Sequence, residues 1–276
     1  MTPVTPIGPM TEVIYIQSKD NPQLKKLRRL VQDALAYRKE QQCWVEGEHL
    51  CRAALDKGWT PQWAVFSESF WQSQAQPWAT FAPKNTVAPD VVFKSVSALE
   101  SLHSFGFVFD LPDAQPIAPN VATLVLDRVQ DAGNVGSMLR SAAAFGFRQV
   151  LALKGTAGLW SSKVLRAGMG AHFGLQLFEG VSLQAVQGLQ MPIITTSSHQ
   201  GQSLHELPLP FPCAWVMGHE GQGVALELAA LSTLQAQIAQ PGGQESLNVA
   251  AAAAICLHAS AISPEALAYV QSVSTV

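Results

Sequence analysis

The chain has 276 residues, of which 48% are hydrophobic and 13% are charged, and its formal net charge is −3. This length suits two domains, and the charged fraction is about half the usual share, which indicates further buried surface such as a subunit interface. A net negative charge excludes a protein coated in positive potential, so any contact with nucleic acid must use a local basic patch.

The cysteines and the apolar runs exclude further classes of protein. Cys43, Cys51, Cys213 and Cys256 are scattered without the spacing of metal ligands, so we expect neither a metal site nor a disulfide framework. The sequence shows no signal-peptide pattern and no apolar run of about 18 residues. We therefore expect a soluble cytoplasmic protein that does not enter a membrane.

The amino-terminal part alternates strand-like and helix-like runs. Leu24, Leu27 and Leu30 recur at helical spacing after Asn21-Pro22, a pair that suits the start of a helix. The pattern predicts a small α/β domain with helices at 21–37 and 47–57 and strands at 13–16, 43–45, 63–66 and 105–109.

Closely spaced prolines separate this part from the rest of the chain. They lie within residues 111–120, and a proline can continue neither a helix nor a central strand. We expect a linker here, between a first domain of residues 11–112 and a second domain of residues 118–276.

The carboxyl-terminal part alternates more strongly. Strands separated by helices of this length predict a mainly parallel sheet, with a ligand site at the carboxyl ends of its strands. The expected strands are 123–127, 149–153, 193–196, 213–217 and 234–238, and the expected helices are 135–145, 163–170 and 249–259.

One polar segment follows the first of these strands. Asn134 opens the expected helix, and Arg140 is the only charge between Val135 and Phe147. In isolation, this pattern favours an N-cap asparagine and an arginine with its stem on an apolar surface. The glycines nearby do not form the G-x-G-x-x-G pattern, which disfavours NAD and ATP.

Two further segments combine glycines with polar side chains. In 218–223, three glycines free the backbone to approach a flat ligand, and Glu220 could accept a hydrogen bond from it; a tight turn with a solvated Glu fits equally well. His219 is interpreted as a loop residue. Before the last apolar helix, Gly242 and Ser246 indicate a turn and an N-cap, with backbone amides facing a pocket.

In this order, the three segments resemble the signature of the SpoU/TrmH family of RNA ribose 2′-O-methyltransferases, over roughly residues 120–260. The resemblance implies S-adenosylmethionine as cofactor and an α/β trefoil-knot methyltransferase domain, preceded by a small α/β RNA-binding domain similar to a ribosomal-protein fold. It also implies a homodimer through the carboxyl-terminal domain. The chain departs from the family pattern at Ala239-Gln240, where Pro-Met is usual, and at Gly168, where Ser is common.

The resemblance also implies the residues of the site. The reacting centre would comprise Asn134, Arg140, Glu220, Ser246 and Asn248. Arg140 either accepts the proton of the 2′-hydroxyl or holds the adjacent phosphate while that phosphate or water takes the proton. The cofactor would be held by Met217, Gly218, Gly223, Ile238, Gln240, Gly242, Ser246, Leu247 and Asn248.

Basic residues suggest where RNA is bound. Basic side chains outnumber acidic ones between residues 19 and 39, and two further basic side chains lie on the helix expected at 163–170. A local excess of positive charge suits contact with RNA phosphates, although basic runs of this kind usually form a solvated helix face. The RNA-binding candidates are Lys19, Lys25, Lys26, Arg28, Arg29, Lys163 and Arg166.

These observations predict transfer of a methyl group from S-adenosylmethionine to a ribose of structured RNA. Ribosomal RNA is the favoured substrate, because a separate amino-terminal domain suits a bulky target. The alternatives are a tRNA 2′-O-methyltransferase, a knotted enzyme that methylates a base nitrogen, and a non-catalytic RNA-binding assembly factor of the same fold.

Overall fold

The computed structural model describes residues 12–99, 104–197, 201–242 and 246–273. These residues form two compact units, which we call unit 1 and unit 2. Unit 1 extends to residue 114 and also includes 160–173, whereas unit 2 comprises 115–159 and the chain from 174 onward. No helix among the described residues is long and apolar enough to cross a membrane.

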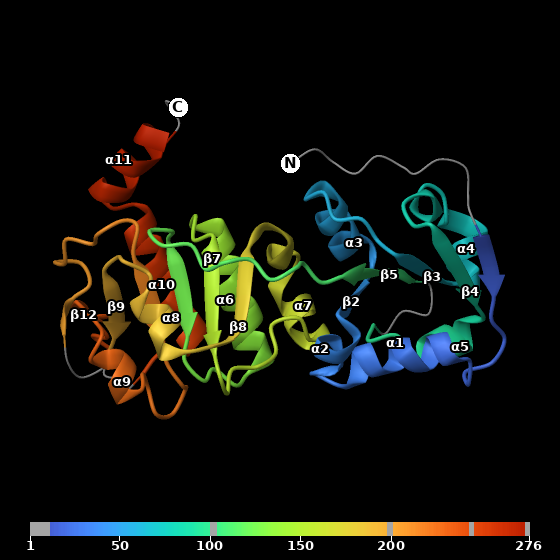
Figure 1. Cartoon of the computed structure of the whole chain (residues 1–276), viewed down its shortest axis with the longest axis horizontal. Coiled ribbons are helices and arrows are strands. Elements are labelled where there is room, and N and C mark those ends of the chain that lie inside the picture. The colour runs from blue at the N-terminus through green and yellow to red at the C-terminus, as the bar shows by residue number, and fades with distance from the viewer. Residues whose placement is uncertain (1–11, 100–103, 198–200, 243–245, 274–276) are drawn as a thin grey trace. The chain divides into compact units, whose positions relative to one another are not determined.

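Unit 1 contains a five-stranded mixed sheet with the order β1-β4-β3-β5-β2 (Figure 1). Its strands are β1 Glu12–Tyr15, β2 Gln42–Glu46, β3 Trp63–Ser67, β4 Lys84–Ala88 and β5 Phe105–Asp110. Its helices are α1 Pro22–Gln32, α2 Ala36–Glu40, α3 Glu48–Asp56, α4 Glu68–Gln74, α5 Asp90–Lys94 and α7 Ser162–Gly168, with a 3₁₀ turn at Trp78–Thr80. Buried aromatic rings from β3 and β5 fill the core, among them Phe66, Phe105 and Phe107.

The first helix is shorter than the sequence predicts. A helix was expected over 21–37, but α1 ends at Gln32 and α2 begins at Ala36. Asp33 Oδ1 accepts the backbone N–H of Leu35 at 2.9 Å. A short acidic side chain that bonds the backbone in this way competes with the helical pattern, which explains the break.

The segment 160–173 packs in unit 1, although the sequence division places it in the domain 118–276. The Ser162 hydroxyl donates to the Val31 carbonyl at 2.7 Å, and Trp59 Nε1 donates to the Phe173 carbonyl at 3.2 Å. The Trp59 ring also contacts Trp160 at 5.5 Å between centroids. These partners are more than 100 positions away in sequence, so no local pattern could reveal them.

Unit 2 contains a seven-stranded sheet with the order β10-β12-β9-β11-β6-β7-β8, and every neighbouring pair is parallel. The mainly parallel sheet expected from the sequence is confirmed. The strands are β6 Thr123–Leu126, β7 Gln149–Leu153, β8 Gln176–Val181, β9 Ile193–Thr196, β10 Gln202–Ser203, β11 Ala214–Met217 and β12 Leu234–Gln237. The helices are α6 Ala132–Ala144, α8 Leu183–Gln187, α9 Leu226–Ala229, α10 Val249–Ala261 and α11 Pro264–Val273. A 3₁₀ turn at Ala171–Gly174 comprises the last residues of the unit 1 segment 160–173 and the first residue of unit 2 that follows it.

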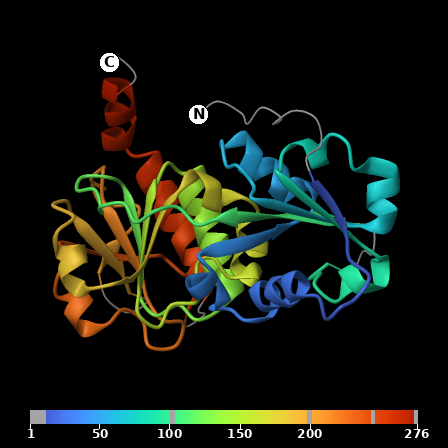
Figure 2. The same ribbon diagram turned by 45° about the vertical axis from the view of Figure 1, so that its right-hand side comes forward.

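Helices cover both faces of this sheet (Figure 2). On one face, Val186 of α8 and Leu228 of α9 pack with strand residues such as Val125 and Val216. On the other face, α10 packs against α6 and β11, and Trp215 Nε1 of β11 donates to the buried Ser260 hydroxyl of α10 at 2.8 Å. The middle strands β6 and β11 are therefore enclosed, and their carboxyl ends open into loops at one edge of the sheet.

Candidate active site

The two central strands end side by side. Leu126 of β6 pairs with Met217 of β11, and the Asp127 N–H donates to the Met217 carbonyl at 2.8 Å. The polar residues that follow β6 and β11 therefore start next to each other, although about 90 positions separate them in sequence. Carboxyl ends of parallel strands are the usual location of ligand sites in such sheets.

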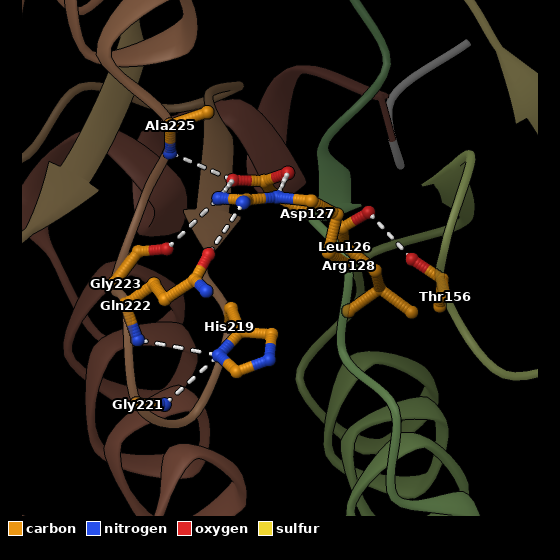
Figure 3. Close-up of polar contacts among 9 residues, drawn as sticks. All are labelled: Leu126, Asp127, Arg128, Thr156, His219, Gly221, Gln222, Gly223 and Ala225. Carbon is orange, nitrogen blue, oxygen red and sulfur yellow. Dashed lines mark hydrogen bonds and ion pairs between the residues drawn. The ribbon is translucent and has the colours of Figure 1, made fainter.

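The loop after β11, residues 219–223, is a tight hairpin that we call the glutamate loop. The backbones of His219 and Gly223 exchange two hydrogen bonds, at 3.0 and 2.8 Å. His219 Nδ1 accepts the N–H groups of Gly221 and Gln222 at 3.0 and 3.2 Å (Figure 3). The imidazole is thus part of the loop's own framework, as the sequence reading of His219 as a loop residue expects.

Gly218 is required by close packing of the loop on itself. A Cβ at this position would lie 2.3 Å from backbone atoms of Gly223 and Val224, closer than any real contact of this kind. The sequence suggested that these glycines let the backbone approach a ligand. At Gly218, the structure shows that the close approach is to the loop's own returning strand.

A chain of hydrogen bonds joins the three polar segments. The Asn248 side-chain amide donates to Asn134 Oδ1 at 3.0 Å, and Asn134 Nδ2 donates to Glu220 Oε1 at 3.3 Å. The Asp131 N–H reaches the same carboxylate oxygen at 3.4 Å. Three of the residues predicted for the reacting centre therefore lie together, one from each segment.

The two helices at this site begin with side chains other than those expected. Asp131, not Asn134, caps α6, because its carboxylate accepts the Asn134 N–H at 2.7 Å. Asn248, not Ser246, caps α10, accepting the N–H groups of Ala250 and Ala251 at 2.9 and 3.2 Å. An N-cap oxygen must reach the N2 or N3 amide, and the helix start at Val249 gives that position to Asn248. The capping also fixes the side chain whose amide group points to Asn134.

Hydrogen bonding sets the charge state of Glu220. Desolvation acts to raise the pKa of this carboxyl, but hydrogen bonds from its own backbone amide, from the Asn134 side chain and from the backbones of Asp131 and Gln130 outweigh it. The net effect lowers the pKa of Glu220 below its ordinary value, because donors to the carboxylate favour its charged form. Glu220 is therefore an anion at neutral pH and an acceptor for a ligand donor.

Arg140 and Ser246 lie outside this network. Both are exposed, and the Arg140 guanidinium forms no hydrogen bond or ion pair with any residue that the structure describes. Arg140 lies six positions after Asn134 on α6, more than one and a half helical turns away. Residues 243–245, where the sequence predicts a turn before Ser246, lie outside the described residues.

Residues 122–258 match the model of the SpoU rRNA Methylase family. The chain is also 31% identical to the 23S rRNA (guanosine(2553)-2′-O)-methyltransferase RlmP of Bacillus subtilis over 218 residues, which cover 78% of this chain and 86% of the relative.

The chain belongs to the SpoU family. Its fold is that of an RNA methyltransferase of the TrmH family from Porphyromonas gingivalis, with a TM-score of 0.73, 33% identity and coverage of 87% of this chain and 97% of the other. The AdoMet-bound rRNA methyltransferase from Sinorhizobium meliloti shares the fold with a TM-score of 0.76 at 24% identity, over 90% of this chain and 97% of that one. The family expected from the three segments is confirmed, and the chain is an S-adenosylmethionine-dependent RNA methyltransferase.

The predicted cofactor residues of this SpoU methyltransferase lie on three segments of unit 2. Buried Met217 ends β11 and buried Gly218 follows it, Gly223 closes the glutamate loop, and the others follow β12 or precede α10. The segment after β12 carries Ile238, Gln240 and Gly242; the segment before α10 carries Ser246, Leu247 and Asn248.

Two buried acceptors near these strand ends fit a hydrogen-bonding cofactor. Gln240 Oε1 is buried and accepts no hydrogen bond from any residue that the structure describes, and the same holds for Thr195 Oγ1, near the end of β9. β9 lies between β11 and β12 in the sheet. An unpaired buried acceptor costs about 1–3 kcal/mol, and S-adenosylmethionine carries amine and hydroxyl donors. Sequence reasoning missed Thr195, because a single threonine in a strand forms no motif.

The predicted RNA-binding residues are mostly engaged by the protein itself. In unit 1, Lys26 and Arg29 both pair with Glu40, at 3.3 and 3.0 Å, and Lys25 pairs with Asp20 at 3.4 Å. The other members divide into exposed and held side chains. Lys19 and Lys163 are exposed, whereas Arg28 donates to the Lys19 and Ser95 carbonyls and the Ser95 hydroxyl, and Arg166 donates to the Ala98 carbonyl at 3.0 Å.

The remaining groups of chemical interest are possible metal ligands and the cysteine thiols. Among the described residues there is no group of three or more histidine, cysteine or acidic side chains placed to hold a metal ion. The four cysteines are buried and free. Burial raises the pKa of the Cys43, Cys213 and Cys256 thiols to about 12, so they stay neutral and unreactive at physiological pH.

Proposed function

We propose that this protein transfers a methyl group from S-adenosylmethionine to a ribose 2′-hydroxyl of ribosomal RNA. The observation that carries the proposal is the hydrogen-bonded series Asn248, Asn134 and Glu220, which brings together one residue from each of the three segments at the end of the central strands. Its family relative RlmP is a 23S rRNA guanosine 2′-O-methyltransferase, which supports both the position of the methyl group and the class of RNA.

The bound cofactor supplies an electrophilic methyl group on a sulfonium centre. The protein's task is then to orient the 2′-hydroxyl toward that methyl and to exclude other orientations, and such alignment is worth several kcal/mol, roughly 7–11 at best. Asn134 and Asn248 supply fixed amide groups, since each is held by a helix start or a neighbour. The Glu220 carboxylate is negatively charged and can accept a hydrogen bond from a hydroxyl or ammonium group.

Arg140 contacts an RNA phosphate in this proposal. A guanidinium keeps its proton to a pH above about 12, and the Arg140 side chain is exposed to water. A charged, exposed arginine is suited to holding a phosphate through two parallel hydrogen bonds. The proton of the 2′-hydroxyl then passes to that phosphate or to water rather than to Arg140.

The carboxyl-terminal unit is proposed to form a homodimer and a trefoil knot, in the cytoplasm. Support for the dimer comes from large apolar side chains that are exposed in and between α10 and α11, including Ile255, Ile262, Leu267 and Tyr269. Support for the knot comes from membership of the SpoU family. Buried free thiols suit a reducing compartment such as the cytoplasm.

Unit 1 is proposed to bind RNA through the α1 face that carries Lys25, Lys26 and Arg29. Surface ion pairs of this kind contribute only about 0–1 kcal/mol, so phosphates can replace Asp20 and Glu40 as partners of these cations. Each phosphate bound would release counterions.

A substrate comparison tests the class of RNA. Purified 23S rRNA, 16S rRNA and total tRNA, each prepared without modification, are incubated with the protein and S-adenosylmethionine labelled in the methyl group. We expect incorporation into one ribosomal RNA at close to one methyl per molecule, and an Asn134→Ala variant should lose it. Incorporation into tRNA alone would replace ribosomal RNA with the tRNA alternative, and none into any RNA would favour a non-catalytic factor.

A further inference from the structure

Arg128, the second residue after β6, has an unusual backbone conformation. Its φ is 58°, in the left-handed region, which costs a residue other than glycine about 1 kcal/mol or more. Gly155 lies against it with no side chain, and a Cβ there would be 3.2 Å from Arg128 Cγ. The fold therefore accepts backbone strain at Arg128 and keeps room for its side chain.

This conformation turns the Arg128 side chain back onto its own neighbour. Nε donates to Asp127 Oδ1 at 2.8 Å, and Nη2 donates to Oδ2 at 3.0 Å. Asp127 is only 2% exposed, so the two-pronged contact neutralises a buried carboxylate. The same contact raises the pKa of Arg128.

The pair then holds the glutamate loop at two points and the backbone just after the loop at a third. Arg128 Nη1 donates to Gln222 Oε1 at 2.9 Å, and Nη2 reaches the Gly223 carbonyl at 3.4 Å. Asp127 Oδ2 accepts the Ala225 N–H at 2.7 Å. Figure 3 shows the guanidinium between the end of β6 and this loop, with its nitrogens directed at both.

We propose that Arg128 is a positioning residue, which holds the glutamate loop in register with β6 so that Glu220 meets Asn134. The inference rests on the role proposed for Glu220 in the reaction. Glu220 lies within the hairpin closed by His219 and Gly223, so a shift of Gln222 and Gly223 would move its carboxylate away from Asn134 Nδ2. Arg128 touches neither Asn134 nor Asn248, and acts only through the loop.

The geometry requires an arginine. The contacts use Nε, Nη1 and Nη2 in a fixed plane on Asp127, Gln222 and Gly223. A lysine keeps the positive charge beside Asp127, but its single ammonium cannot reach both sides of this fork. Arg128→Lys therefore preserves the neutralisation of the buried carboxylate and removes the hold on the loop.

The test compares Arg128→Lys with Arg148→Lys in the full-length protein without RNA. Arg148 is an exposed arginine of the same unit whose side chain forms no hydrogen bond with any described residue, so it controls for the chemistry of the substitution. Hydrogen exchange of the backbone amides at 219–225 is measured first. We expect it to become at least about fivefold faster in Arg128→Lys and to stay unchanged in Arg148→Lys. Unchanged exchange in both variants would overturn the proposal.

Turnover separates positioning from stability and from the proposed function. Arg128→Lys should lower kcat about tenfold or more with KM for RNA within about twofold, and Gln222→Glu, which keeps an acceptor for Nη1, should retain kcat. If Glu220→Gln lowers kcat while Arg128→Lys leaves it unchanged, Arg128 does not position the loop for the reaction. If Glu220→Gln leaves kcat unchanged, the role of Glu220 fails, whereas faster exchange in Arg128→Lys would still support the hold on the loop.

Discussion

At the residue scale, the site is built from side chains that satisfy one another before any ligand arrives. Asn248 caps α10 with its oxygen and donates with its nitrogen to Asn134, so a single amide both starts a helix and fixes its neighbour. Asn134 in turn donates to the Glu220 carboxylate. Each group has little freedom left, which is the arrangement that orients a reacting hydroxyl efficiently.

The lowered pKa of Glu220 gives a dependence of stability on pH. A carboxyl whose folded pKa is depressed contributes stability that is present above its unfolded pKa, about 4.3, and that is lost as the pH falls through the lower folded value. We expect the wild type to exceed Glu220→Gln in free energy of unfolding at pH 7, with the gap closing below about pH 4. Urea unfolding of both proteins from pH 3 to 7 measures it, and a gap independent of pH would contradict the charge assigned to Glu220.

Arg140→Ala should remove activity without removing the fold. Because the Arg140 side chain is exposed and forms no hydrogen bond or ion pair with a described residue, its loss should change the free energy of unfolding by less than about 0.5 kcal/mol. Loss of a charged group that holds the substrate phosphate should lower kcat/KM by about 100-fold or more. Arg148→Ala is the matched control, and near-normal turnover of Arg140→Ala would leave Arg140 as an ordinary surface residue.

Gln240→Met tests the buried acceptor in the cofactor segment. The substitution keeps the length of the side chain but removes Oε1, which has no partner within the described chain. If a donor of S-adenosylmethionine binds there, affinity should fall about fivefold, since a hydrogen bond contributes roughly 1 kcal/mol. Calorimetry measures it, with exposed Gln202→Met as control; equal or tighter binding by Gln240→Met would show that the cofactor does not use this oxygen.

At the element scale, most helices and strands could be predicted from apolar patterns, and those that were not have identifiable causes. β4 carries the buried polar residues Asn85 and Thr86, so no apolar alternation marks the strand; Asn85 Nδ2 donates to the Ala79 carbonyl, and the Trp63 indole donates to Thr86 Oγ1. β8 is an edge strand with a bulge opposite Ala152 and Leu153, and it is only partly buried.

The site shows the same division between local and long-range information. The sequence motifs identified Asn134, Glu220 and Asn248, because a motif is recognised from residue types and spacing within one short segment. The holding role of Arg128 could not be read from the sequence, since it depends on a partner loop 94 positions away. The sequence predicted Ser246 and Asn134 as N-caps, whereas Asn248 and Asp131 occupy these positions in the structure. The identity of an N-cap depends on the residue at which the helix begins, and composition defines that residue only to within a helical turn.

The α1 face gives a prediction about RNA binding. Replacing Lys25, Lys26 and Arg29 together with Ala should weaken RNA binding and flatten its salt dependence by up to about three units of slope. Affinity for S-adenosylmethionine should not change, because these residues belong to unit 1 and the cofactor segments to unit 2. Filter binding over a range of salt concentrations measures the slope. An unaltered slope would place the RNA contacts elsewhere, with Lys163 as the next candidate.

At the scale of the whole molecule, the low charged fraction and the exposed apolar side chains of the last two helices point to the same buried interface. Ile262 and Leu267 are 58% and 56% exposed in the single chain, and a second copy would remove this surface from water. We expect a dimer at micromolar concentration by sedimentation equilibrium, and Ile262→Glu should convert it to monomer. Val91→Glu, at an exposed apolar position of unit 1, is the control and should leave the dimer intact; a wild-type monomer would remove the proposed interface.

The chemical position of the methyl group is the most direct test of the account. Ribosomal RNA methylated by the protein with labelled S-adenosylmethionine is hydrolysed in alkali, and the products are separated by size. A ribose 2′-O-methyl group blocks cleavage at its own phosphodiester, so we expect the label in an alkali-resistant dinucleotide, and none there with Asn134→Ala. Label released entirely in mononucleotides would place the methyl group on a base and contradict the function proposed for this site.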